Sequence, residues 1–156
     1  MSINDARSAH APIPVLTGST LVTLLVVGCS PADSYDSAEL NGADAQVSVV
    51  EVEDLYLVAL EEGEPGRFLG TLINQSVLPV TVTMSDDDDE VIVIVPAESE
   101  FAFAENATIF ETADVTPGTI MTISMEVGPD DESVEIPVVD GTAEEYRDFA
   151  PADPER

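Results

Sequence analysis

The second and larger part of the chain, from Val47 onward, divides into short apolar runs separated by polar turns. In residues 80–84 and 119–127, apolar side chains alternate with threonine, serine or glutamate. Because side chains alternate between the two faces of a β-strand, each segment predicts a half-buried strand. Further strands are predicted at 68–73, 101–103 and 134–138. No segment between 47 and 140 has the period of an amphipathic helix.

Two of the predicted strands depart from this alternation. Residues 47–60 are rich in valine, leucine and tyrosine and hold no proline, which predicts one long strand or two joined by a bulge near Glu53 and Asp54. Residues 91–95 (Val-Ile-Val-Ile-Val) are apolar on both faces. We therefore expect this strand to lie in the centre of a sheet.

Turn signals recur about every ten residues, which is the spacing of an antiparallel sandwich or small barrel. They include the acidic run 86–90, Pro117-Gly118 in the order of a type II turn, and residues 128–132. The predicted fold is all-β, an antiparallel immunoglobulin-like or cupredoxin-like β-sandwich of seven to eight strands, over residues 47–140.

Residues 141–156 predict a short helix docked on the sandwich, followed by a polar tail. Thr142 and Glu145 have the spacing of a capping box, and Tyr146 and Phe149 would share one helix face. Pro151 would end the helix.

The N-terminal part has a different pattern. The apolar run from Val15 to Val27 is too short to cross a bilayer, which takes about 20 apolar residues. Its length is typical of the apolar core of a secretory signal. It ends at Gly28 and Cys29, and residues 30–46 are rich in serine, aspartate, alanine and glycine. We expect a signal peptide over 1–28 and a flexible tether over 29–46.

Val26-Val27-Gly28-Cys29 resembles the lipobox of bacterial lipoproteins. The resemblance implies cleavage before Cys29 and a diacylglycerol on its sulfur, an anchor with two acyl chains. Cys29 is the lipidation residue of this prediction, and the location it implies is the extracytoplasmic face of the cell membrane. The alternative is an uncleaved short core helix with a buried free thiol.

Acidic residues dominate the charge of the chain, with 32 carboxylates against four arginines and a net charge of −28. Such a surface repels nucleic acid, and we expect no nucleic-acid partner. The hydrophobic content of 44% is nevertheless that of a folded domain. A single cysteine excludes an internal disulfide, so packing must hold the fold.

Candidate chemistry in the chain is sparse. The only histidine is His10, inside the predicted signal peptide, and there is no lysine. A nucleophile would therefore lack its usual base, and we expect no enzyme and no cofactor. The run 86–90 has the oxygen ligands of Ca²⁺ but not the spacing of a calcium loop, so a solvated turn is the preferred interpretation and calcium-dependent adhesion the weaker one.

Several segments in a shared order resemble one family, the periplasmic copper chaperones of the PCuAC type, and within it the actinobacterial LpqE-like lipoproteins. The segments are Phe68-Leu69-Gly70-Thr71-Leu72-Ile73-Asn74, Val95-Pro96-Ala97, Val115-Thr116-Pro117-Gly118 and 119–127 leading into Val134-Glu135-Ile136-Pro137-Val138. The resemblance covers residues 46–149. It implies a β-sandwich, and it points to an envelope protein as partner, such as a membrane respiratory complex.

The copper ligands of that family do not carry over. The family uses histidines and methionines, including a His-x-Met pair after a Pro-Gly turn, whereas the predicted mature chain offers only Met84, Met121 and Met125. Met121 and Met125 lie four residues apart on one strand face, roughly 13 Å at the rise of a strand, which is too far to share one ion. We therefore expect core methionines and no metal site.

The sequence predicts a lipid-anchored, non-enzymatic β-sandwich that acts as an interaction or assembly accessory in the cell envelope. The alternative is a copper-binding periplasmic chaperone that uses methionine and acidic ligands.

Overall fold

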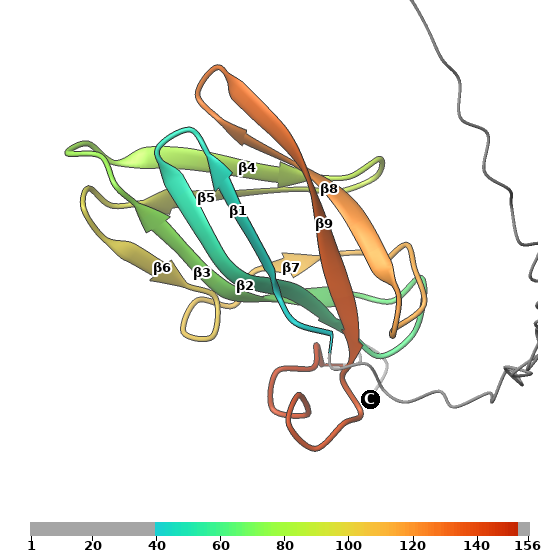
Figure 1. Cartoon of the computed structure of the whole chain (residues 1–156). Helices are drawn as coiled ribbons and strands as arrows, with labels where there is room; N and C mark the ends of the chain where they lie inside the picture. Colours follow the sequence, from blue (N-terminus) through green and yellow to red (C-terminus); the bar gives the residue numbers. More distant parts are fainter. Residues whose placement is uncertain (1–39, 153–156) are drawn as a thin grey trace, which may run out of the picture. The chain divides into compact units, whose positions relative to one another are not determined.

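The computed structural model describes residues 40–152, and this part of the chain is built from β-strands joined by turns and loops (Figure 1). The strands are β1 (Ala43–Val47), β2 (Val50–Ala59), β3 (Gly66–Asn74), β4 (Val80–Ser85), β5 (Glu90–Val95), β6 (Glu100–Ala102), β7 (Ile109–Phe110), β8 (Ile120–Val127) and β9 (Asp130–Asp140). The predicted all-β sandwich is confirmed. β1 begins before Val47, inside the segment assigned to the tether, while Cys29 and the predicted signal peptide lie outside the described residues.

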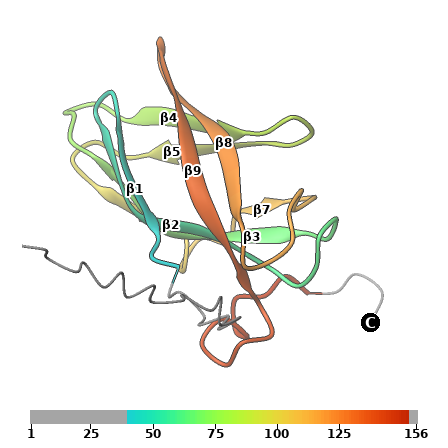
Figure 2. The same cartoon turned by 45° about the vertical axis from the view of Figure 1, so that its right-hand side comes forward.

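Two sheets form the sandwich, and β9 belongs to both. In one sheet the order is β5-β4-β8-β9, with antiparallel neighbours; in the other, β2 pairs with β1 and β3, and β3 pairs with β6 and β7. The last residues of β9, Val138–Asp140, lie parallel to Leu57–Ala59 of β2. Figure 2 shows β9 crossing from the layer of β4 and β8 to the layer of β2 and β3. The sandwich is therefore barrel-like, and one of its pairings is parallel.

A bulge in β2 makes this arrangement possible. Along one edge, β2 pairs with β1 as far as Leu55 and with β9 from Leu57 onward. The register with β1 shifts between Val52 and Leu55, and the register with β3 shifts between Glu53 and Tyr56. Asp54 occupies the bulge with a φ of 50°. The prediction of a bulge near Glu53 and Asp54 is thus confirmed, whereas the hairpin at Ser48 and Val49 that adds β1 was not predicted.

Two glycines let neighbouring backbone approach the bulge closely. Gly70 on β3 has a φ of +119°, and a Cβ built there would lie 2.6 Å from the carbonyl oxygen of Asp54. Gly42, just before β1, would place a Cβ against the backbone of Asp54 from another direction. Both positions require glycine because any side chain would collide with main-chain atoms.

The core follows the predicted alternation. Met121, Ile123, Met125 and Val127 of β8 are buried, as are Val82 and Met84 of β4. Aromatic rings fill the opposite sheet: the centroid of Phe68 lies 4.7 Å from that of Phe110 and 5.8 Å from that of Phe103. Burial of each such side chain stabilises the fold by about 1.5–3 kcal/mol.

Asn74 is the one buried polar side chain within residues 40–152, and it ties the two sheets together at one end. Its Nδ2 donates to the carbonyl oxygens of Leu78 at 2.8 Å and Pro96 at 2.9 Å, with Val95 O at 3.2 Å. Its Oδ1 accepts from the backbone N–H of Ser76. Both polar atoms of this side chain have hydrogen-bond partners. Its burial therefore avoids the cost of a buried donor or acceptor that has no partner.

β5 does not lie in the centre of a sheet, so that prediction was wrong. It is the end strand of its sheet and pairs with β4. Val93 and Val95 face the core, but Ile92 and Ile94 are 60% and 64% exposed. The outward face of this apolar strand is covered by no other element of the described part of the chain.

The predicted C-terminal helix is absent: residues 141–150 form successive turns. Asp140, not Thr142, begins the segment, because its Oδ1 accepts the N–H of Thr142 at 2.8 Å. The docking itself is as predicted, since Tyr146, Phe149 and Ala150 pack on Val58, Leu69 and Val139. Successive turns already bring both aromatic rings onto the sheet, so the burial of these rings does not require a helix.

The close approach at the bulge yields a test with a matched control. Gly70→Ala should lower the free energy of unfolding by about 3–5 kcal/mol, because a positive φ and a main-chain collision both oppose the new methyl group. Gly63→Ala, at a φ of +84° with no atom within 4 Å of the new Cβ, should cost only about 1–2 kcal/mol. Urea denaturation measures both values, and equal costs would contradict the close approach.

Candidate functional site

Cys29, the predicted lipidation residue, lies outside residues 40–152, so its role stays a prediction. Within residues 40–152, no helix is both long and apolar enough to cross a membrane. Within these residues, the candidate sites are the methionines and the acidic hollows on the surface, among them one at the β4–β5 turn and one on the hairpin of β1 and β2.

The three methionines of the domain are core residues, as predicted. Met84 and Met125 are fully buried and Met121 is 3% exposed. Met84 and Met125 are register partners on β4 and β8 and lie side by side on the inward face. This pairing was not foreseen, because it depends on which strands are neighbours and not on spacing within one strand.

One acidic hollow, of about 410 Å³, lies between the β4–β5 turn, β8 and the loop before β8. Its lining includes Asp86, Asp87, Asp114 and Met121. Asp86 Oδ1 accepts the N–H groups of Asp88 at 3.0 Å and Asp89 at 2.7 Å, which folds the acidic run into the predicted turn. The other oxygen of Asp86 is buried and has no hydrogen-bond partner.

The charge in this hollow acts on Asp114. Desolvation raises the pKa of its carboxyl group, and repulsion from Asp86, Asp88, Asp89 and Asp87 raises it further. The hollow is therefore a place where negative charges are held close together on fixed turns, and it attracts cations in general.

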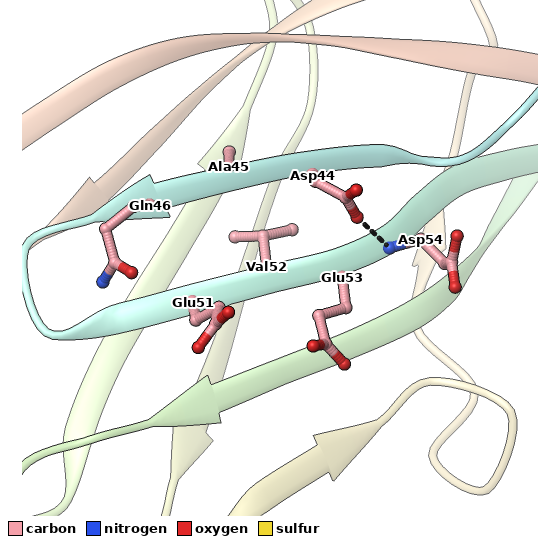
Figure 3. Close-up of a pocket in the computed structure, with 7 residues that line it drawn as sticks. All are labelled: Asp44, Ala45, Gln46, Glu51, Val52, Glu53 and Asp54. Carbon is pink, nitrogen blue, oxygen red and sulfur yellow. Dashed lines mark hydrogen bonds between the residues drawn. The ribbon is translucent and has the colours of Figure 1, made fainter.

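A second hollow, of about 550 Å³, lies on the hairpin of β1 and β2 (Figure 3). Its lining includes the carboxylates of Asp44, Glu51, Glu53 and Asp54. Asp44 Oδ1 accepts the N–H of Asp54 at 3.0 Å and so supports the bulge. Glu51 accepts a hydrogen bond from Gln75 Nε2 at 2.7 Å. These two carboxylates thus have structural partners in the hairpin and in the β3–β4 loop.

Neither hollow amounts to a metal centre by its side chains. Among residues 40–152, no three histidine, cysteine, aspartate or glutamate side chains are grouped so that they could hold one ion. Met121 is the one soft donor that lines the first hollow, and its companions there are hard carboxylates, which prefer different metals.

Comparison with known proteins agrees with the fold. No family model matches the sequence, and no curated protein matches it. Among solved structures, the chain is similar to the copper-bound PCuAC domain from PmoF2, with a TM-score of 0.50 and 15% sequence identity, over 62% of this chain and 97% of that one. The described domain therefore has a PCuAC-like β-sandwich fold. This comparison does not address the finer resemblance, to the LpqE-like lipoproteins, which stays a prediction.

The raised pKa of Asp114 predicts how stability depends on pH. The charged form of Asp114 is disfavoured in the folded protein and therefore lowers the free energy of unfolding. This loss of stability is full above the raised pKa and vanishes as the pH falls below the ordinary value of 3.8. Asp114→Asn should therefore raise the melting temperature at pH 7 by roughly 1–3 °C, a small gain because the group is exposed and screened.

The gain from Asp114→Asn should disappear near pH 3.8 and shrink in high salt. Glu135→Gln, on the outward face of β9, is the control that removes one charge away from the acidic turn. Thermal melts from pH 3 to pH 8 give both curves. A gain that persists at the lowest pH would mean that the effect does not come from charge.

Proposed function

We propose that this chain is a lipid-anchored, non-enzymatic accessory of the cell envelope, attached through Cys29 to the extracytoplasmic face of the membrane. Its β-sandwich would serve interaction or assembly with an envelope protein. As the family resemblance suggests, membrane respiratory complexes are the first partners to examine, and the LpqE-like lipoproteins the branch to which the chain would belong.

The observation that carries this proposal is the position of the methionines. In a domain with the fold of a copper-bound PCuAC neighbour, Met84, Met121 and Met125 point into the core and are at most 3% exposed. The histidine of the chain, His10, belongs to the segment that the proposal removes. The buried methionines and the removal of His10 support the proposal that a domain with a copper-chaperone-like fold has a role other than copper binding.

The sequence before the domain supports the anchor. The apolar run of residues 15–27 is followed directly by Gly28 and Cys29, and residues 30–39 before the described domain are rich in serine, aspartate and alanine. The charge supports the absence of catalysis: with no lysine, and with the acidic runs 86–90 and 130–132 in turns or at the start of a strand, the domain offers few groups poised for acid–base work.

The anchor has a direct test. Mass spectrometry of the chain isolated from membranes should give an N-terminal peptide that begins at Cys29 and carries two acyl chains. Cys29→Ser should abolish this modification and leave the precursor uncleaved, because the sulfur is the acceptor atom. Ser30→Ala is the matched control and should be lipidated normally. An intact Met1 or an unmodified thiol in the wild-type chain would refute the anchor.

A second candidate function, a copper-binding chaperone with methionine and acidic ligands, is favoured by one observation: Met121 lines the same hollow as Asp86 and Asp114. Titration with Cu(I) against a chromophoric chelator separates the two functions. We expect no tight one-to-one binding, because the pair Met84 and Met125 is sealed from solvent and carboxylates are poor ligands for Cu(I).

The variants Met121→Leu and Met84→Leu complete this titration. Tight binding that Met121→Leu abolishes and Met84→Leu leaves intact would favour the copper chaperone and count against the leading proposal.

A further inference from the structure

Exposed aliphatic side chains lie on two neighbouring segments of the domain, β5 and the β3–β4 loop. Ile92 and Ile94 project outward from β5, while Val77 and Leu78 lie in the β3–β4 loop and are 74% and 68% exposed. These four residues are called the β5 surface below. On β4, the register partner of Ile94 is Thr81, which is exposed and polar, so the row of exposed aliphatic side chains on β5 does not continue onto β4.

The two parts of the β5 surface are held together by Asn74. Its Nδ2 donates to Leu78 O and to Pro96 O, directly after β5, so the loop and the strand share one buried anchor. Ser76 Oγ donates to Leu78 O at 2.7 Å, and the N–H of Glu98 donates to Ser76 O at 2.9 Å. The loop is therefore preorganised, and a partner would not have to order it on binding.

Carboxylates flank the β5 surface at both ends. Asp87, Asp88 and Glu90 are exposed before or at the start of β5, and Glu98 and Glu100 are exposed after it. The two arginines within residues 40–152 lie elsewhere: Arg67 stacks on Phe149 at 5.3 Å, and Arg147 donates to Thr142 O. The rim of this apolar surface is thus negative.

We propose that the β5 surface is the docking site for a protein partner whose contact region is apolar at its centre and carries lysine or arginine at its rim. This inference rests on the proposed function as an interaction accessory and names the surface that performs it. An apolar centre with a polar, charged rim is the usual anatomy of a protein interface. The acidic rim selects against a second copy of this chain, which would bring like charges together, and against anionic lipid.

Position-specific cross-linking in the host membranes tests the proposal with the full chain. A photoreactive benzoylphenylalanine replaces Ile94, and in the control it replaces Glu135, on the outward face of β9 in the same sheet. We expect Ile94 to yield a cross-link to one protein segment with apolar residues flanked by lysine or arginine. The yield should fall at least about fivefold between low and 0.5 M salt, since screening weakens rim charges.

Outcomes that overturn the proposal are equally definite. They are a cross-link to lipid, to a second copy or to an acidic segment, or a yield no higher than that from Glu135. A double variant, Ile92→Thr with Ile94→Thr, adds a second readout with the photoreactive group at Leu78. Cross-linking should drop about tenfold while the melting temperature stays within about 2 °C, because both side chains are exposed. An unchanged yield would overturn the proposal.

The same sample separates this inference from the proposed anchor. Mass spectrometry of the N-terminal peptide reports the lipid on Cys29 independently of the cross-link. A cross-link of the expected kind without lipid would refute the anchor alone, and a lipidated chain without the cross-link would refute the docking surface alone.

Discussion

The bulge at Asp54 is the constraint on which the rest of the domain depends. It lies near the end of the β1 pairing along one edge of β2, just before the stretch that pairs with the end of β9, and only that second stretch joins the two sheets. Gly42 and Gly70 allow the backbone to pack tightly around it, and Asp44 accepts the N–H of Asp54. A regular strand in its place would turn the side chains of the following residues, including the stretch that pairs with β9, to the opposite face of the sheet.

Once the sheets are joined, the inward and outward positions of every strand are fixed, and with them the chemistry that the domain can offer. The three methionines of residues 40–152 fall inside, where thioethers serve as flexible core side chains. The carboxylates fall on turns and outward faces, where water solvates them. Four of the seven large aliphatic side chains exposed in the described part of the chain lie on the two segments that Asn74 joins, namely Val77, Leu78, Ile92 and Ile94.

Local patterns predicted most of the fold. Alternation placed β4 and β8 and the inward methionines correctly, and the turn at Pro117 and Gly118 is present, with a φ of +95° at Gly118. Apart from the hairpin at Ser48 and Val49, the features that escaped prediction are mainly non-local. Whether Ile92 and Ile94 meet another layer, and whether Met84 faces Met125, depends on strand order, which no spacing along the chain encodes. In the C-terminal segment, the local helix signal is overridden by tertiary packing, because turns already place its aromatic rings on the sheet.

The parallel pairing of β2 with β9 also has a consequence for how the domain comes into being. It joins Leu57–Ala59 to Val138–Asp140. The contact that joins the two sheets therefore links the second strand of the domain to the last one. Such a contact closes a very long loop and forms slowly. During synthesis from the N-terminus, the apolar side chains of the earlier strands therefore stay exposed until β9 has been made. The strongly repulsive charge of −28 is well suited to keep neighbouring unfinished chains apart during that interval.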